Sequence, residues 1–107
     1  MAKAISVFQQ MTSPSVEDYF LAGNAFLEQN RPAEAVTCFL QAQKKNKEQQ
    51  THLFEDDTEY YLAMSYLKNG QQALAIPIFE KIHDEPGHPY HDKISSWFLR
   101  KLHWLRK

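Results

Sequence analysis

The chain has 107 residues, of which 43% are hydrophobic and 23% charged, with a formal net charge of −1. This composition is too apolar for a disordered protein, and the near-neutral charge provides no electrostatic footprint for nucleic acid or anionic lipid. A single cysteine, Cys38, excludes an internal disulfide and a metal site built from thiolates.

The first predicted helix covers residues 2–12 and places Ala4, Phe8 and Met11 on one face, with the spacing Ala-x3-Phe-x2-apolar. The same spacing recurs twice further along the chain, at Ala35, Phe39 and Ala42 and again at Ala75, Phe79 and Ile82. A recurring pattern of this kind indicates repeated helical units.

A helical pair is predicted over residues 16–46. Ser13 or Ser15 can cap its first helix, and Pro32 suits the opening position of its second. Gly23 is small where the two helices are expected to cross closely. Residues 44–50 are polar on all sides, which indicates either an overlong, solvated helix end or a loop.

A second pair is predicted over residues 56–84, at a constant offset of about 40 residues from the first. The offset joins Phe26 to Tyr66, Ala35 to Ala75 and Phe39 to Phe79. Asp56, Asp57 or Thr58 is expected to cap the first helix of this pair. Pro77 predicts a kink or a late start in the second helix.

A last helix is predicted over residues 89–106, opened by Pro89. Trp97 and Trp104 fall on an apolar stripe with Ile94, Phe98 and Leu105, so we expect both indoles in the core. Arg100, His103 and Lys107 would make the outer face polar, as in a capping helix. Contact of the two tryptophans and their cationic neighbours with nucleic acid or lipid is the less favoured alternative.

These patterns resemble the tetratricopeptide repeat (TPR) superfamily over roughly residues 16–83. Residues 59–68, 75–82 and 88–90 are also similar to C-terminal TPR tails of Bacteroidetes proteins. The resemblance implies an all-α, right-handed α-solenoid in one domain, residues 1–107, with two full repeats and a half-repeat helix at each end. It further implies a bacterial protein in the cytoplasm or periplasm, with the soluble tail of a membrane-anchored protein as one possibility. Since Ala4, Phe8 and Met11 match a second TPR helix with no first helix before it, the chain is also expected to be a fragment that begins in mid-repeat.

In TPR proteins the first helix of each pair lines the inner face, so the resemblance also implies a binding groove. Its expected residues are Phe20, Asn24, Leu27, Tyr60, Met64, Leu67 and Phe98, with Glu17, Leu102 and Leu105 as further members. This face is apolar, which favours a non-catalytic scaffold that binds a peptide or another protein. The alternative is a structural module whose apolar face is covered by its own end helix or by a second copy in a homodimer.

Other kinds of site are not expected. Some TPR adaptors clamp a terminal carboxylate with Lys and Asn; Asn24 matches one position, but Phe20 and Tyr60 offer no cation. The histidines His83, His88 and His91, with Asp84 and Asp92, suggest surface turn residues rather than a metal site. Cys38 suggests a structural thiol. We therefore expect no cofactor, no metal, no catalysis, no nucleic-acid partner and no direct membrane insertion by this segment.

Overall fold

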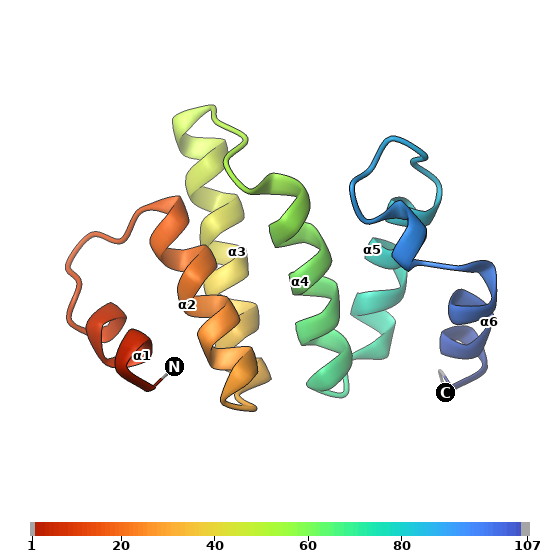
Figure 1. The fold of residues 1–107 in the computed structure, drawn as a ribbon, viewed down its shortest axis with the longest axis horizontal. Coiled ribbons are helices and arrows are strands. Elements are labelled where there is room, and N and C mark those ends of the chain that lie inside the picture. The colour runs from red at the N-terminus through yellow and green to blue at the C-terminus, as the bar shows by residue number, and fades with distance from the viewer. Residues whose placement is uncertain (1, 106–107) are drawn as a thin grey trace.

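The computed structural model describes residues 2–105, which form six α-helices packed sequentially antiparallel (Figure 1). The elements are α1 (Ala2–Gln9), α2 (Val16–Glu28), α3 (Pro32–Gln49), α4 (Glu55–Lys68), α5 (Gln72–His83), a 3-10 turn η1 (His91–Lys93) and α6 (Ser96–Leu105). The all-α class predicted from the sequence is therefore confirmed. Within the described residues no helix combines the length and apolarity needed to cross a bilayer.

Gly23 allows α2 and α3 to cross at short range. An ideal Cβ at this position would lie 2.6 Å from Cε1 and Cζ of Phe39, whose ring is fully buried. The bare glycine backbone thus accepts the ring of Phe39, which permits the close helix crossing that was expected at Gly23. In the next pair, Ala63 and Phe79 occupy the corresponding positions and are fully buried as well.

Some helices begin where residues close in sequence can cap or start them. Ser15 caps α2 through a capping box: its Oγ accepts from the Asp18 N–H, and Asp18 Oδ2 accepts from the Ser15 N–H. Pro32 opens α3 as predicted. The α5 helix begins at Gln72, so the alternative of a late start is wrong, and Pro77 lies inside the helix on an exposed position.

The α3 helix runs on to Gln49, so residues 44–50 are the overlong helix end rather than a loop. They are not solvated on all sides, however, because Asn46 is only 5% exposed. Its Nδ2 donates to Leu53 O at 2.9 Å, and its Oδ1 accepts from Leu53 N–H and from Thr51 Oγ1. Asn46 therefore fixes the connection between α3 and α4.

That connection also changes the start of α4. The helix begins at Glu55, and Phe54 takes the capping position with a left-handed φ of 53° and no side-chain cap. The prediction of a cap at Asp56, Asp57 or Thr58 is wrong. The loop held by Asn46 brings the chain into the helix earlier, so the two aspartates lie in the first turn, beside the positive end of the helix dipole.

The last helix begins at Ser96, seven residues after the predicted start at Pro89. Ser95 Oγ accepts from the Phe98 N–H, as an N-cap does. Between Pro89 and Ser96 only the short 3-10 turn η1 is helical, and this segment is tied to α4, because the Tyr90 hydroxyl donates to Asp57 Oδ1 at 2.6 Å. The predicted end at Arg106 and the polar contribution of Lys107 lie outside the described residues.

Candidate functional site

Two adjoining hollows lie between α2 and α4, with the segment after α5 as one wall. One has a volume of about 400 Å³ and the other about 600 Å³. Both are lined by Asn24, Glu28, Tyr61 and Tyr90, so they form one surface, which we call the α2–α4 groove. Leu27, Tyr60, Met64, Lys68 and Lys93 complete the first hollow; Ala4, Phe20, Leu21, Phe54 and Asp57 complete the second.

A continuous run of aromatic rings forms much of this surface. Phe54 stacks on Phe20 with ring centroids 4.9 Å apart, and Phe20 meets Tyr61 edge-on at 6.2 Å. Tyr61 meets Tyr60 edge-on at 5.2 Å, and Tyr60 stacks on Tyr90 at 4.3 Å. Each ring is oriented by its neighbours, so the groove presents a preorganised apolar surface.

Five of the seven predicted groove residues line these hollows: Phe20, Asn24, Leu27, Tyr60 and Met64. The other two do not. Leu67 packs against the core formed by α4, α5 and α6, and Phe98 meets Phe79 edge-on at 5.2 Å within that core. Among the further members, Leu102 is buried in the same core, whereas Glu17 and Leu105 are exposed and line neither hollow.

Sequence reasoning missed Tyr61 and Tyr90. Tyr61 is adjacent to Tyr60 on α4, and both residues line the first hollow. A wider estimate of the groove-lining face of α4 would have included Tyr61. Tyr90 had no such signal, because its partner Asp57 lies 33 residues earlier. Burial, reinforced by the hydrogen bond to Asp57, raises the pKa of Tyr90 well above its usual value, and burial also raises the pKa of Tyr60.

Comparison with known families identifies the helical pair formed by α4 and α5. Residues 57–88, which include most of α4 and all of α5, match the family model of the tetratricopeptide repeat. The pair is a TPR. Comparisons with curated proteins and with solved structures find no match.

The groove is therefore built in part from the first helix of a TPR, α4. TPR domains are generally protein-interaction modules, and stacked repeats of this kind present extended binding surfaces. TPR repeats are also typically non-catalytic.

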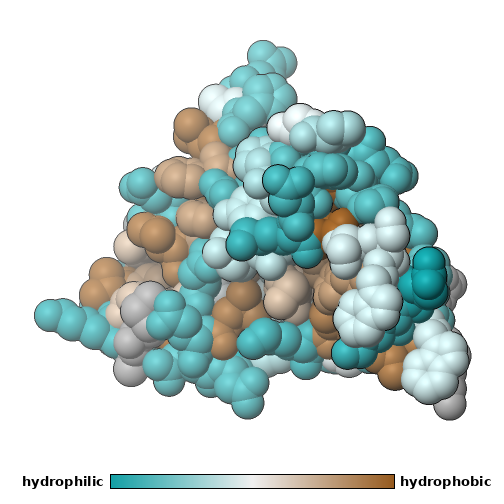
Figure 2. Space-filling model, turned by 45° about the vertical axis from the view of Figure 1, so that its right-hand side comes forward, coloured by the Kyte–Doolittle hydropathy of each residue, from teal (hydrophilic) through white to brown (hydrophobic). Residues whose placement is uncertain are grey.

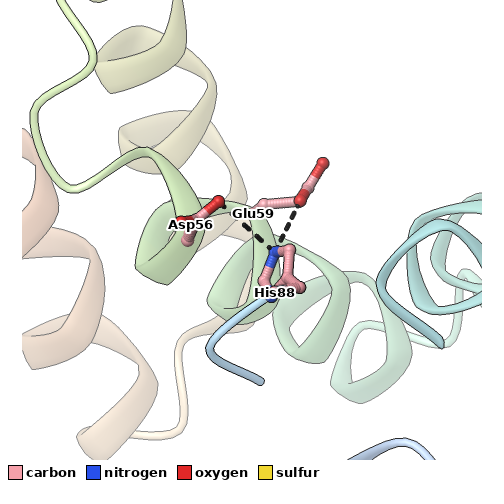
Figure 3. Close-up of side chains that lie close together, drawn as sticks. All are labelled: Asp56, Glu59 and His88. Atoms are coloured by element: carbon pink, nitrogen blue, oxygen red, sulfur yellow. Dashed lines mark hydrogen bonds and ion pairs between the residues drawn. The ribbon is translucent and has the colours of Figure 1, made fainter. Parts of the chain in front are cut away.

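His88 lies at the C-terminal limit of the TPR match, and its side chain is almost fully buried rather than on the surface as predicted. Asp56 and Glu59 project from α4 toward it (Figure 3). His88 Nε2 lies 3.0 Å from Glu59 Oε1 and 3.5 Å from Asp56 Oδ1. The other histidines of the predicted set lie apart from this group: His83 Nδ1 contacts Ile94 O at 2.7 Å.

The geometry of His88 favours a structural role over metal binding. Its Nδ1 accepts from the Tyr90 N–H at 3.1 Å, so the neutral ring must carry its proton on Nε2 and donate it to Glu59. A metal on Nε2 would require the proton on Nδ1, where it would meet the Tyr90 N–H. Glu59 is already engaged on its other oxygen by Lys81 Nζ at 2.8 Å. The group is thus a hydrogen-bonded tie between α4 and the segment after α5.

Cys38 does not belong to the groove. It is buried in α3, and burial, with a smaller contribution from the charge of Glu34, raises the pKa of its thiol to about 11. A thiol that stays protonated at neutral pH is a poor nucleophile, which agrees with the predicted structural role.

Proposed function

We propose that the α2–α4 groove binds an apolar or amphipathic segment of another protein, within a domain whose repeats are residues 16–46 and 56–84. The supporting observation is the run of half-buried aromatic rings between α2 and α4, left at the surface beside Met64. Aromatic and methionine side chains dominate the energetics of protein interfaces, because they bury much area at low entropic cost.

The polar groups around the groove indicate how a segment would be oriented. Asn24 Nδ2 donates to Phe20 O, which orients the amide and leaves Oδ1 suited to accept from a backbone N–H of the ligand. Glu28 lies on one side of the first hollow, and Lys68 and Lys93 lie on the other elements that line it. A ligand with an apolar centre and charges of both signs near it fits this arrangement.

Met64→Glu tests the proposal, with the fold of the variant checked by circular dichroism because Met64 also packs against the core of α4, α5 and α6. Met64 is half-exposed in the first hollow, whereas Tyr60 is stacked on Tyr90 and its replacement would loosen the fold. Peptides would be selected from a displayed random library on the wild-type protein, and their affinities measured for both proteins by fluorescence anisotropy. We expect Met64→Glu to weaken binding more than about tenfold, since a buried interface charge costs over 1.4 kcal/mol.

The matched control is Leu40→Glu, which makes the same change at an exposed leucine of α3 that lines neither hollow. Its affinity should stay at the wild-type value. Equal loss of binding in both variants, or none in Met64→Glu, contradicts the assignment of the groove.

Self-association is the second candidate, and a separate observation favours it. An open hollow of about 490 Å³ lies between α1 and α2, lined mainly by apolar side chains that include the exposed Val7, Met11 and Leu21. Apolar side chains gather at this end of the molecule in the space-filling view (Figure 2). Light scattering over a concentration series tests this candidate: a dimer that Val7→Glu dissociates supports it, because Val7 lines this hollow and not the α2–α4 groove, and a monomer throughout removes it.

A further inference from the structure

The most exposed large hydrophobic side chains described in this protein are the two tryptophans, and both lie on α6. Trp97 is 67% exposed and Trp104 is 79% exposed, so the prediction that they belong to the core is wrong. The physical reason is that α6 packs on α5 through its other side, with Leu102 buried and Phe98 against Phe79. Figure 1 places α6 at one end of the molecule, and the space-filling view in Figure 2 shows pale side chains projecting on that side.

The outward side of α6 combines aromatic and cationic residues. Trp97, Arg100, Lys101 and Trp104 follow the i, i+3, i+4, i+7 spacing of one helix face, and they surround a shallow hollow of about 260 Å³. Lys101 Nζ lies 5.4 Å from the ring centroid of Trp97. The exposed Leu105 extends the apolar part of this surface by one residue. We call these five residues the tryptophan face.

The charge of the chain is strongly asymmetric around this face. Residues 93–107 contain five Lys and Arg and no Asp or Glu, whereas residues 1–92 contain 7 Lys and Arg against 13 Asp and Glu. His103, which also lies on α6, is turned toward α5, where its Nε2 contacts Glu80 Oε2 at 2.9 Å. The near-neutral net charge of the chain therefore hides a cationic end that is attracted to anionic surfaces.

A further repeat helix does not fit on the tryptophan face. In the repeat register of Tyr19, Gly23 and Phe26, the residues of α6 are Trp97, Lys101 and Trp104. The position that is glycine in α2, and lies against the ring of Phe39, is thus a lysine in α6. A lysine there prevents the close helix crossing that this position makes in the repeats.

We propose that the tryptophan face is a peripheral docking surface for anionic lipid bilayers. Indole rings that present an apolar body and a polar N–H partition to the interfacial region, and neighbouring Lys and Arg are attracted to anionic head groups. The face favours lipid over nucleic acid for two reasons. Lys101 covers one face of the Trp97 ring, where a base would stack, and Leu105 adds aliphatic surface that stacking does not use.

The experiment uses a property of this chain: its two tryptophans both lie on the proposed face, so intrinsic tryptophan fluorescence reports on that face alone. The protein would be titrated with vesicles of phosphatidylcholine mixed with phosphatidylglycerol, and with vesicles of pure phosphatidylcholine. We expect a shift to shorter wavelength and protection from acrylamide quenching only with the mixed vesicles, and a weaker effect at high salt.

Variants distinguish this surface from general electrostatic attraction. R100Q/K101Q should weaken partitioning by about 30-fold, since each juxtamembrane cation contributes about 1 kcal/mol. The matched control K44Q/K47Q removes two exposed cations from α3 and should bind as wild type. W97A/W104A, measured by co-sedimentation, should lose at least about tenfold through lost apolar burial.

The proposal is overturned if no spectral shift occurs at high lipid concentration, if pure phosphatidylcholine binds equally well, or if K44Q/K47Q weakens binding as much as R100Q/K101Q. Binding of a single-stranded oligonucleotide without binding of mixed vesicles overturns it as well. None of these results depends on whether the α2–α4 groove binds a peptide.

Discussion

Replacing Gly23 with alanine should destabilise this protein, although alanine is the better helix former. The added Cβ would lie 2.6 Å from two atoms of the Phe39 ring and 2.9 Å from a third. The ring cannot move away easily, because Phe39 is fully buried and packs beside Phe20 and Tyr61 at centroid distances of 6.2 and 6.3 Å. The α2 and α3 backbones must then separate, which disturbs the core between these helices, where Phe26 and Ala35 are buried.

Two effects of opposite sign set the magnitude. Removing a glycine from a helix interior gains about 1 kcal/mol, whereas overpacking a well-packed core costs about 1–3 kcal/mol. Since the clash involves a buried ring rather than a flexible side-chain end, we expect a net loss of about 1 kcal/mol. For a domain of this size that loss lowers the melting temperature by roughly 4–8 °C. Urea denaturation followed by circular dichroism measures it directly.

A double-mutant cycle tests the cause. Phe39→Leu removes the ring atoms that the new methyl would meet, so Gly23→Ala should cost little or even stabilise in the Phe39→Leu background. The two changes should therefore deviate from additivity by at least about 1 kcal/mol. Additive free energies, or stabilisation by Gly23→Ala alone, would refute the close crossing.

Three other predictions follow from side chains outside the α2–α3 crossing. Asn46→Ala should cost about 2–3 kcal/mol in urea denaturation, because it leaves Leu53 and Thr51 without their buried partner, whereas the exposed Gln49→Ala should change little. Because the pKa of Tyr90 is raised in the folded state, its phenol contributes its full stabilisation below the unfolded-state pKa of about 10, and this contribution is lost as the pH rises above that value. Tyr90→Phe should therefore remove this part of the loss of stability at alkaline pH, measured by thermal melts at pH 8–11. Cys38, with its pKa raised to about 11, should react with a disulfide reagent at neutral pH only after unfolding, and rapid labelling of the native protein would contradict its burial.

The sequence predicted those features whose causes are local. The alanine–phenylalanine spacing located the second helix of each pair, and the expected cap at Ser13 or Ser15 marked the start of α2, because both signals depend on residues within one or two turns. These signals were sufficient for the fold class, and the resemblance to TPR proteins supplied five residues of the candidate site.

The errors concern contacts between distant parts of the chain. His88 looked like a surface turn residue because its partner Glu59 lies 29 residues away, and Tyr90 was missed because Asp57 lies 33 residues away. The tryptophans of α6 were misplaced for another reason. Both sides of that helix carry large apolar residues, and periodicity alone does not tell which side packs on α5.

The position of Tyr90 divides prospective ligands of the α2–α4 groove into two classes. A ligand that stacks on Tyr60 must first separate Tyr60 from Tyr90 and break the bond to Asp57, so its measured affinity falls tenfold for every 1.4 kcal/mol that this opening costs. A ligand that reaches only Asn24, Leu27 and Met64 does not have to open the Tyr60–Tyr90 contact. Under the function proposed above, Tyr90 would therefore discriminate among segments by the depth to which they enter the groove.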